Sequence, residues 1–154
     1  MEVVVRNEYV SNLISYLKIC GQNLRTLHRH LIGGNWFDDH ERLSEYYEKI
    51  DDFEDSTVEA MLSLGFDDVS ISEAGRIFML LENRDYETAE AFRLAHSYFV
   101  KLEDFFKDVM KHCSLPAGIN SEFENMMYWL EIEANYKLKR FLSSADLGYL
   151  FKEE

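Results

Sequence analysis

The sequence has little proline, glycine or cysteine, and its basic residues are few. One proline and seven glycines in 154 residues are too few to punctuate a sandwich or barrel of many short strands. Lysine and arginine total 16 against 29 aspartates and glutamates, a net charge of −13, which argues against nucleic-acid backbone binding as the main function. The acidic balance suits a protein that handles cations.

Long apolar runs are also missing. No segment approaches the roughly 20 apolar residues of a membrane span, and the first ten residues lack the regions of an export signal. Cys20 and Cys113 have no metal-ligand spacing, and we interpret them as reduced packing residues. The sequence therefore predicts a cytoplasmic protein with one domain over residues 1–154, long enough to form a core without disulfides or a structural metal.

Apolar residues recur at three-and-four spacing, which predicts four long amphipathic helices. The first covers about residues 6–32, and the second runs from about residue 38 to a break at Gly65. The third carries an apolar stripe over residues 92–109, and the fourth carries one over residues 123–141. The fold class is therefore all-α, a four-helix bundle.

Two capping boxes refine these boundaries. Ser70 and Glu73 predict a short helix within residues 70–82, inside the connection between the second and third long helices. Ser121 and Glu124 predict the start of the fourth long helix. The C-terminal tail, residues 144–154, has no clear period and few basic residues.

Residues 27–65 hold the chemistry, because they contain three of the five histidines and many carboxylates. Imidazole and carboxylate without thiolate form the ligand set expected for iron, manganese or zinc. His28 ends the first helix and His40 begins the second, so the turn between them can bring them together. A lone histidine is more often a packing or capping residue, and both interpretations stay open here. His30 lies roughly 200° around the helix from His28 and cannot serve the same ion.

The second helix also carries an acidic stripe. It comprises residues three and four apart: Glu41, Glu45, Glu48, Asp52, Asp55 and Glu59. One interpretation is a solvated face. The other is a face opposite something cationic, since unrelieved like charges at this spacing cost a few tenths of a kcal/mol per pair.

Helix geometry limits how a site can form. Asp55 and Glu59 lie 15 and 19 residues beyond His40, about 22 to 28 Å along one helix. One chain cannot unite these carboxylates with His28 and His40, whereas two chains with antiparallel second helices across a twofold axis can. A di-iron site inside the bundle is not expected, because no Glu-x-x-His motif occurs.

This spacing resembles that of the Dps-type miniferritins (DNA-binding protein from starved cells), a family of the ferritin-like superfamily. The resemblance extends over nearly the whole chain. It includes the four spaced ligands and the family's glycine, aromatic and closing Leu-Gly positions: His28, His40, Asp55, Glu59, Gly33, Trp36-Phe37 and Leu64-Gly65.

The resemblance implies a ferritin-like bundle that assembles into a homododecameric cage. It implies ferroxidase sites at twofold interfaces, with His28 and His40 from one subunit and Asp55 and Glu59 from its neighbour. There ferrous iron is oxidised, preferably by hydrogen peroxide, and ferric iron is stored in the cavity, which protects against oxidative damage. Glu41 and Glu45 match the acidic inner surface where the mineral nucleates.

Two positions depart from the family pattern. Ser44 stands where the family usually has an aspartate, and a serine hydroxyl is a poor iron ligand. We expect Glu48, one turn further on the same face, to substitute for it in part. Arg29 stands where an aromatic is common. Two alternatives follow: a cage or bundle with a degenerate site and a structural or interaction role, or a site that binds zinc or manganese without redox turnover.

Direct DNA binding is not expected. The family members that bind DNA use a Lys/Arg-rich terminal tail, whereas here the first ten residues contain only Arg6 and the last ten only Lys152. Too few basic contacts are available to release counterions from DNA.

Overall fold

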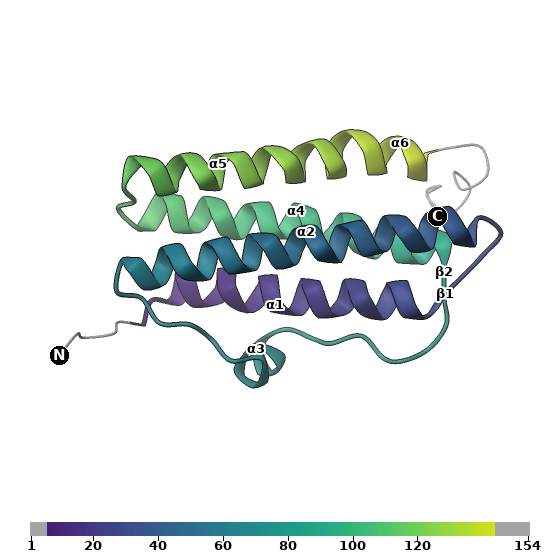
Figure 1. The fold of residues 1–154 in the computed structure, drawn as a ribbon, viewed down its shortest axis with the longest axis horizontal. Helices are drawn as coiled ribbons and strands as arrows, with labels where there is room; N and C mark the ends of the chain where they lie inside the picture. Colours follow the sequence, from purple (N-terminus) through teal and green to yellow (C-terminus); the bar gives the residue numbers. More distant parts are fainter. Residues whose placement is uncertain (1–5, 144–154) are drawn as a thin grey trace, which may run out of the picture.

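Four long helices lie side by side in the computed structural model, which describes residues 6–143 (Figure 1). They are α1 (Glu8–Arg29), α2 (Trp36–Ser63), α4 (Thr88–His112) and a fourth made of α5 (Ala117–Glu131), the π-helical η1 (Ile132–Leu138) and α6 (Lys139–Leu142). The predicted all-α bundle is confirmed. The short α3 (Ile71–Ile77) lies in the long connection between α2 and α4. The predicted tail over residues 144–154 falls outside the described residues.

Helix α1 shows how the sequence sets these elements. Asn7 caps it, because its side chain accepts hydrogen bonds from the backbone N–H groups of Tyr9 and Val10. Its apolar stripe, including Leu17 and Leu24, is fully buried, and α2 is the helix that it contacts most. Burying this stripe is the main reason that the helix is stable, since most helical stability in proteins comes from packing of an amphipathic face.

One predicted capping box is confirmed and the other is wrong. Ser70 caps α3 and accepts a hydrogen bond from the N–H of Glu73 at 3.1 Å, although α3 ends at Ile77, earlier than expected. Helix α5 begins at Ala117, so Ser121 lies inside it. The helix starts early because Pro116 precedes it, and proline favours helix starts, where its missing N–H costs nothing.

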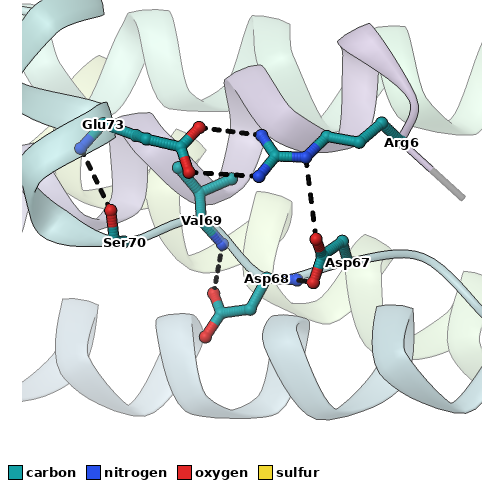
Figure 2. A network of polar contacts seen from close by, with 6 residues as sticks. All are labelled: Arg6, Asp67, Asp68, Val69, Ser70 and Glu73. Carbon is teal, nitrogen blue, oxygen red and sulfur yellow. Dashed lines mark hydrogen bonds and ion pairs between the residues drawn. The ribbon is translucent and has the colours of Figure 1, made fainter. Parts of the chain in front are cut away.

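A polar network fixes α3 against the start of the chain (Figure 2). Arg6 donates two hydrogen bonds to the carboxylate of Glu73, at 2.8 and 3.1 Å, and forms an ion pair with Asp67 at 3.6 Å. The pKa of the Glu73 carboxyl lies below its usual value, chiefly because of the Arg6 hydrogen bond. These groups are exposed, so their contribution is mainly positional.

The turn before α2 is tied to the turn before α4 by a feature that the sequence did not indicate. β1 (Leu31–Ile32) and β2 (Tyr86–Glu87) form a two-residue parallel pair. Gly33 follows β1 with φ +151°, and a Cβ there would lie 2.4 Å from Oγ1 of Thr88. Only glycine fits this close approach, which holds the start of α2 beside the start of α4.

The cysteines and the long helices agree with two further expectations. Cys20 is buried, Cys113 is half-buried, and both are free thiols. None of the helices among residues 6–143 is long and apolar enough to cross a membrane.

Candidate metal-binding half-site

His28 and His40 face each other across the turn between α1 and α2. Their rings are stacked with centroids 3.6 Å apart and an interplanar angle of 20°. Nδ1 of His28 lies 2.7 Å from the carbonyl oxygen of His40, and Nδ1 of His40 lies 2.8 Å from the carbonyl oxygen of His28. The two histidines therefore hold each other through a reciprocal pair of hydrogen bonds.

These bonds fix the tautomer of the rings. A carbonyl oxygen can only accept, so each Nδ1 carries a proton, and Nε2 is the nitrogen that can hold a lone pair. Burial lowers the pKa of His28 below its usual value, and the charges of His40 and Arg29 lower it further. The hydrogen bond to the His40 carbonyl and the charge of Glu48 act in the opposite direction and raise this pKa in part. A neutral imidazole with Nδ1 bonded to a carbonyl is the form that binds metal ions.

The stacking of the two rings limits how they could hold a metal ion. Rings 3.6 Å apart and inclined by 20° have planes that meet only about 10 Å away, whereas a metal ion lies about 2 Å from its imidazole nitrogen, in the ring plane. One ion therefore cannot bind both Nε2 atoms unless a ring turns. The observed arrangement suits two neighbouring ions.

Aromatic residues from α2 hold the histidine pair in place. Trp36 stacks on His40 with centroids 4.2 Å apart, and its indole N–H donates to the carbonyl oxygen of Leu31 at 2.8 Å. Tyr47 sets the edge of its ring against His28 at 5.4 Å. Trp36 is one of the aromatic positions in the family resemblance, whereas sequence reasoning assigned no role to Tyr47.

The support for Tyr47 is a charge pair that sequence reasoning missed. The guanidinium of Arg25 lies 4.7 Å from the centre of the Tyr47 ring and forms an ion pair with Asp51. A Cβ on Gly21 would lie 3.0 Å from Oδ1 of Asp51, so this glycine leaves room for the carboxylate against α1. The sequence did contain a signal for this pair, because Arg25 lies one helical turn before His28 and Asp51 lies one turn after Tyr47.

The structure does not bring Asp55 and Glu59 to the histidines. Helix α2 runs unbroken from Trp36 to Ser63, so these carboxylates lie about 22 to 28 Å along it from His40. Both are exposed, as are the other members of the acidic stripe. Among the described residues, no group of three or more potential ligands could hold a metal ion within one chain. Within the described part of one chain, the histidine pair therefore has no third protein ligand beside it.

Ser44 and Glu48 lie on the same side of α2. The hydroxyl of Ser44 donates to the backbone carbonyl of Glu41 at 2.7 Å, so it is turned back onto its own helix. Glu48 is exposed, and its charge acts on His28 by raising the pKa of the ring. Of the two side chains, the carboxylate is the better oxygen ligand for a hard cation.

The remaining histidines have other surroundings. The carbonyl oxygen of His30 accepts from the N–H of Tyr86 at 3.0 Å, which joins the two turns. His112 stacks on Tyr9 with ring centroids 4.0 Å apart. His96 is half-buried, and burial together with the charge of Lys139 lowers its pKa.

Comparison with known proteins settles the fold. No protein-family model and no curated protein sequence matches the chain. Antigen TpF1 from Treponema pallidum matches with a TM-score of 0.76 and 19% identity, over 94% of this chain and 100% of that one. Dps from Staphylococcus aureus matches with a TM-score of 0.70 and 17% identity, over 95% of each chain. The chain has a Dps-type, ferritin-like fold.

Proposed function

We propose that this chain, which has the Dps-type fold, is a miniferritin that oxidises ferrous iron at sites shared by two subunits. Ferric iron is then stored inside a homododecameric cage in the cytoplasm, which keeps iron away from peroxide. The observation that carries the proposal is the reciprocal His28–His40 pair. It presents two imidazoles that are bonded through Nδ1 next to a turn, and no third ligand of the same chain completes the site among the described residues.

Asp55 and Glu59 complete the proposed site from the neighbouring subunit. They are exposed and one helical turn apart, so they can bind one ion together. With two α2 helices antiparallel across a twofold axis, each pair of subunits has two identical sites. The acidic stripe of one subunit then faces cations, which removes the cost of its like charges.

The proposed reaction uses iron as the substrate. Two ferrous ions each give one electron to hydrogen peroxide, its O–O bond breaks, and two protons are taken up to form two water molecules. The histidines hold iron through neutral nitrogen, and the carboxylates stabilise the harder ferric product. Glu41 and Glu45, exposed on α2, are the proposed nucleation residues for the mineral.

Glu48 takes part of the role that Ser44 cannot fill. We expect Glu48→Gln to weaken ferrous binding at least about tenfold, as loss of a metal-site carboxylate commonly does. Glu122→Gln is the matched control, because it makes the same change at an exposed position on α5, outside the acidic stripe. Equal isotherms for the two variants would exclude Glu48 as a ligand.

The experiment that tests the function is an anaerobic ferrous titration of the purified protein, followed by addition of peroxide. Absorbance and particle size are recorded together. We expect saturation at about two ions per chain, since each subunit pair has two sites and each site binds two ions. Rapid oxidation should follow in a particle of about twelve chains. A monomer that binds no iron would contradict the proposal.

The back-bonded Ser44 hydroxyl favours a second candidate, a cage whose metal site is degenerate and whose role is structural or in protein interaction. A cage of full size that binds no metal identifies it. Binding of zinc or manganese with no iron oxidation would identify a non-redox metal site instead.

Direct DNA binding is not part of the proposed function. The net charge is −13 and the terminal segments carry few basic residues. A salt-sensitive gel shift of duplex DNA at neutral pH would contradict this expectation.

A further inference from the structure

A pocket of about 440 Å³ opens between the start of α2 and the π-helical part of the fourth helix. Its lining includes neither histidine, and it combines three cationic side chains with three carboxylates, Asp38, Asp39 and Glu133. Arg42 comes from α2, Lys137 from η1 and Arg140 from α6. Three cations at one pocket are conspicuous in a chain with a net charge of −13.

Two of these cations have unused hydrogen-bonding capacity. Among the described residues, the ion-pair partner of Arg42 is Glu45, at 3.4 Å and with both side chains half exposed, which is a weak pair. Arg140 lies over the ring of Tyr136, 5.1 Å from its centre, and no described carboxylate lies within 4 Å of it. A guanidinium has five N–H donors, so both side chains can bind a further anion.

Two of the three acidic groups of the pocket accept hydrogen bonds from neighbouring side chains. Glu133 is buried and accepts hydrogen bonds from the Tyr46 hydroxyl at 3.3 Å and from Lys137 at 3.1 Å. Asp39 is buried and accepts from the Thr88 hydroxyl at 3.2 Å. Asp38 is exposed in the first turn of α2, where the helix dipole offsets its charge. Asp39 and Glu133 are therefore partly occupied as acceptors, whereas Arg42 and Arg140 keep donors for a ligand.

Aromatic side chains form a further part of the wall. Phe92, Tyr136 and Phe141 line the pocket beside the cations. The volume exceeds that of one phosphate ion, so a larger ligand with an anionic end and a planar body also fits. Arginine is well suited to the anionic end, because its fork donates two parallel hydrogen bonds to one oxyanion.

We propose that this pocket binds a phosphate group, as free phosphate or as a small phosphomonoester. Arg42 and Arg140 donate to the phosphate oxygens, and Lys137 adds its charge. The aromatic wall contacts any organic part of the ligand. The inference does not depend on the proposed iron chemistry, because none of the residues Arg42, Lys137 and Arg140 belongs to the proposed iron site.

The test is isothermal titration of the full chain, freed of metal with EDTA and kept at low ionic strength. The probes are inorganic phosphate and AMP. We expect a Kd for phosphate on the order of 1 mM or below. Arg42→Gln and Arg140→Gln should each weaken binding about five- to tenfold, the usual effect of losing a charge-assisted hydrogen bond. Arg76→Gln is the matched control, since it removes the same charge from an exposed site on α3.

Each outcome decides the matter. Tighter binding of AMP than of phosphate, lost in the two pocket variants, supports a phosphomonoester ligand. Equal affinity for the two probes, lost in the same variants, supports free phosphate. The proposal is overturned if neither probe binds, or if Arg76→Gln weakens binding as much as the pocket variants. Circular dichroism and particle size confirm that each variant is folded.

Discussion

Glu103 on α4 is a buried carboxyl group whose ionisation should control stability. It is 8% exposed, and among the described residues no hydrogen-bond donor contacts its Oε2. Nζ of Lys107 lies 3.8 Å from that oxygen, too far for a hydrogen bond. Burial, joined by the adjoining carboxyl of Glu131 on α5 and the charge of Asp104, raises the pKa of Glu103 to about 7, although Lys107 opposes this.

The direction of the pH effect follows from this pKa. The usual value is 4.5, so between pH 4.5 and 7 the folded chain holds a proton that the unfolded chain has lost. The free energy of unfolding therefore falls as pH rises through this window, and the full cost is present above pH 7. The difference corresponds to at most about 3 kcal/mol. Glu103→Gln removes the charge and keeps the shape, so it should stabilise the fold by about 1–3 kcal/mol at pH 8 and leave it nearly unchanged at pH 5.

Urea unfolding at pH 5 and pH 8 measures this effect, at one fixed protein concentration because assembly adds to apparent stability. Asp108→Asn is the matched control, since it removes an exposed carboxylate from the same helix. The difference between Glu103→Gln and the wild type should appear at pH 8 only. If Glu103→Gln gives the same change at both pH values, or none at pH 8, the reasoning about its burial is refuted.

Two further substitutions test the connection between α2 and α4. Asn23→Ala should lower the free energy of unfolding by about 2–4 kcal/mol, measured by thermal unfolding. The reason is that the buried Asn23 amide donates to the Met79 carbonyl at 3.1 Å and accepts from the Leu81 N–H at 2.9 Å. A loss below about 0.5 kcal/mol would contradict this. Gly33→Ala should lower the free energy of unfolding by about 1–3 kcal/mol, because its Cβ clashes with Thr88. Combining it with Thr88→Ala should recover part of that loss. No recovery would show that the clash is not the cause.

The four long helices were predictable because their apolar residues repeat with the helical period and few breakers interrupt them. The spacing that put Leu17 and Leu24 on one face also buried them. The start of the fourth helix was mistaken, because two helix-start signals competed. Pro116 determined the boundary, whereas the Ser121 pattern lay within the helix.

The π-helical segment could not be predicted, since a shift from i−4 to i−5 hydrogen bonds leaves no periodic trace in seven residues. Glu133 and Lys137, which line the pocket proposed to bind phosphate, belong to this segment. The same limit applies to the two-residue pair of β1 and β2. Two-residue strands form only where the tertiary structure brings two turns together that are far apart in the sequence.

The candidate site was predictable in position and not in geometry. The sequence placed His28 and His40 at the two ends of one turn, and the structure brings them together. It did not indicate that each ring bonds to the carbonyl of the other or that Arg25 and Asp51 support Tyr47. Ring orientation depends on packing from both helices, which no local pattern records.

The central claim is that each iron site is assembled from two chains, and mixing of variants tests it most directly. One variant is His28→Ala/His40→Ala and the other is Asp55→Asn/Glu59→Gln, and each alone should oxidise almost no iron. When the two variants are co-assembled in equal amounts, half of the twofold pairs should contain one chain of each variant. One of the two sites in each mixed pair is then intact, so about a quarter of the wild-type ferroxidase rate should return. A mixture no more active than its separate components would contradict the two-chain site.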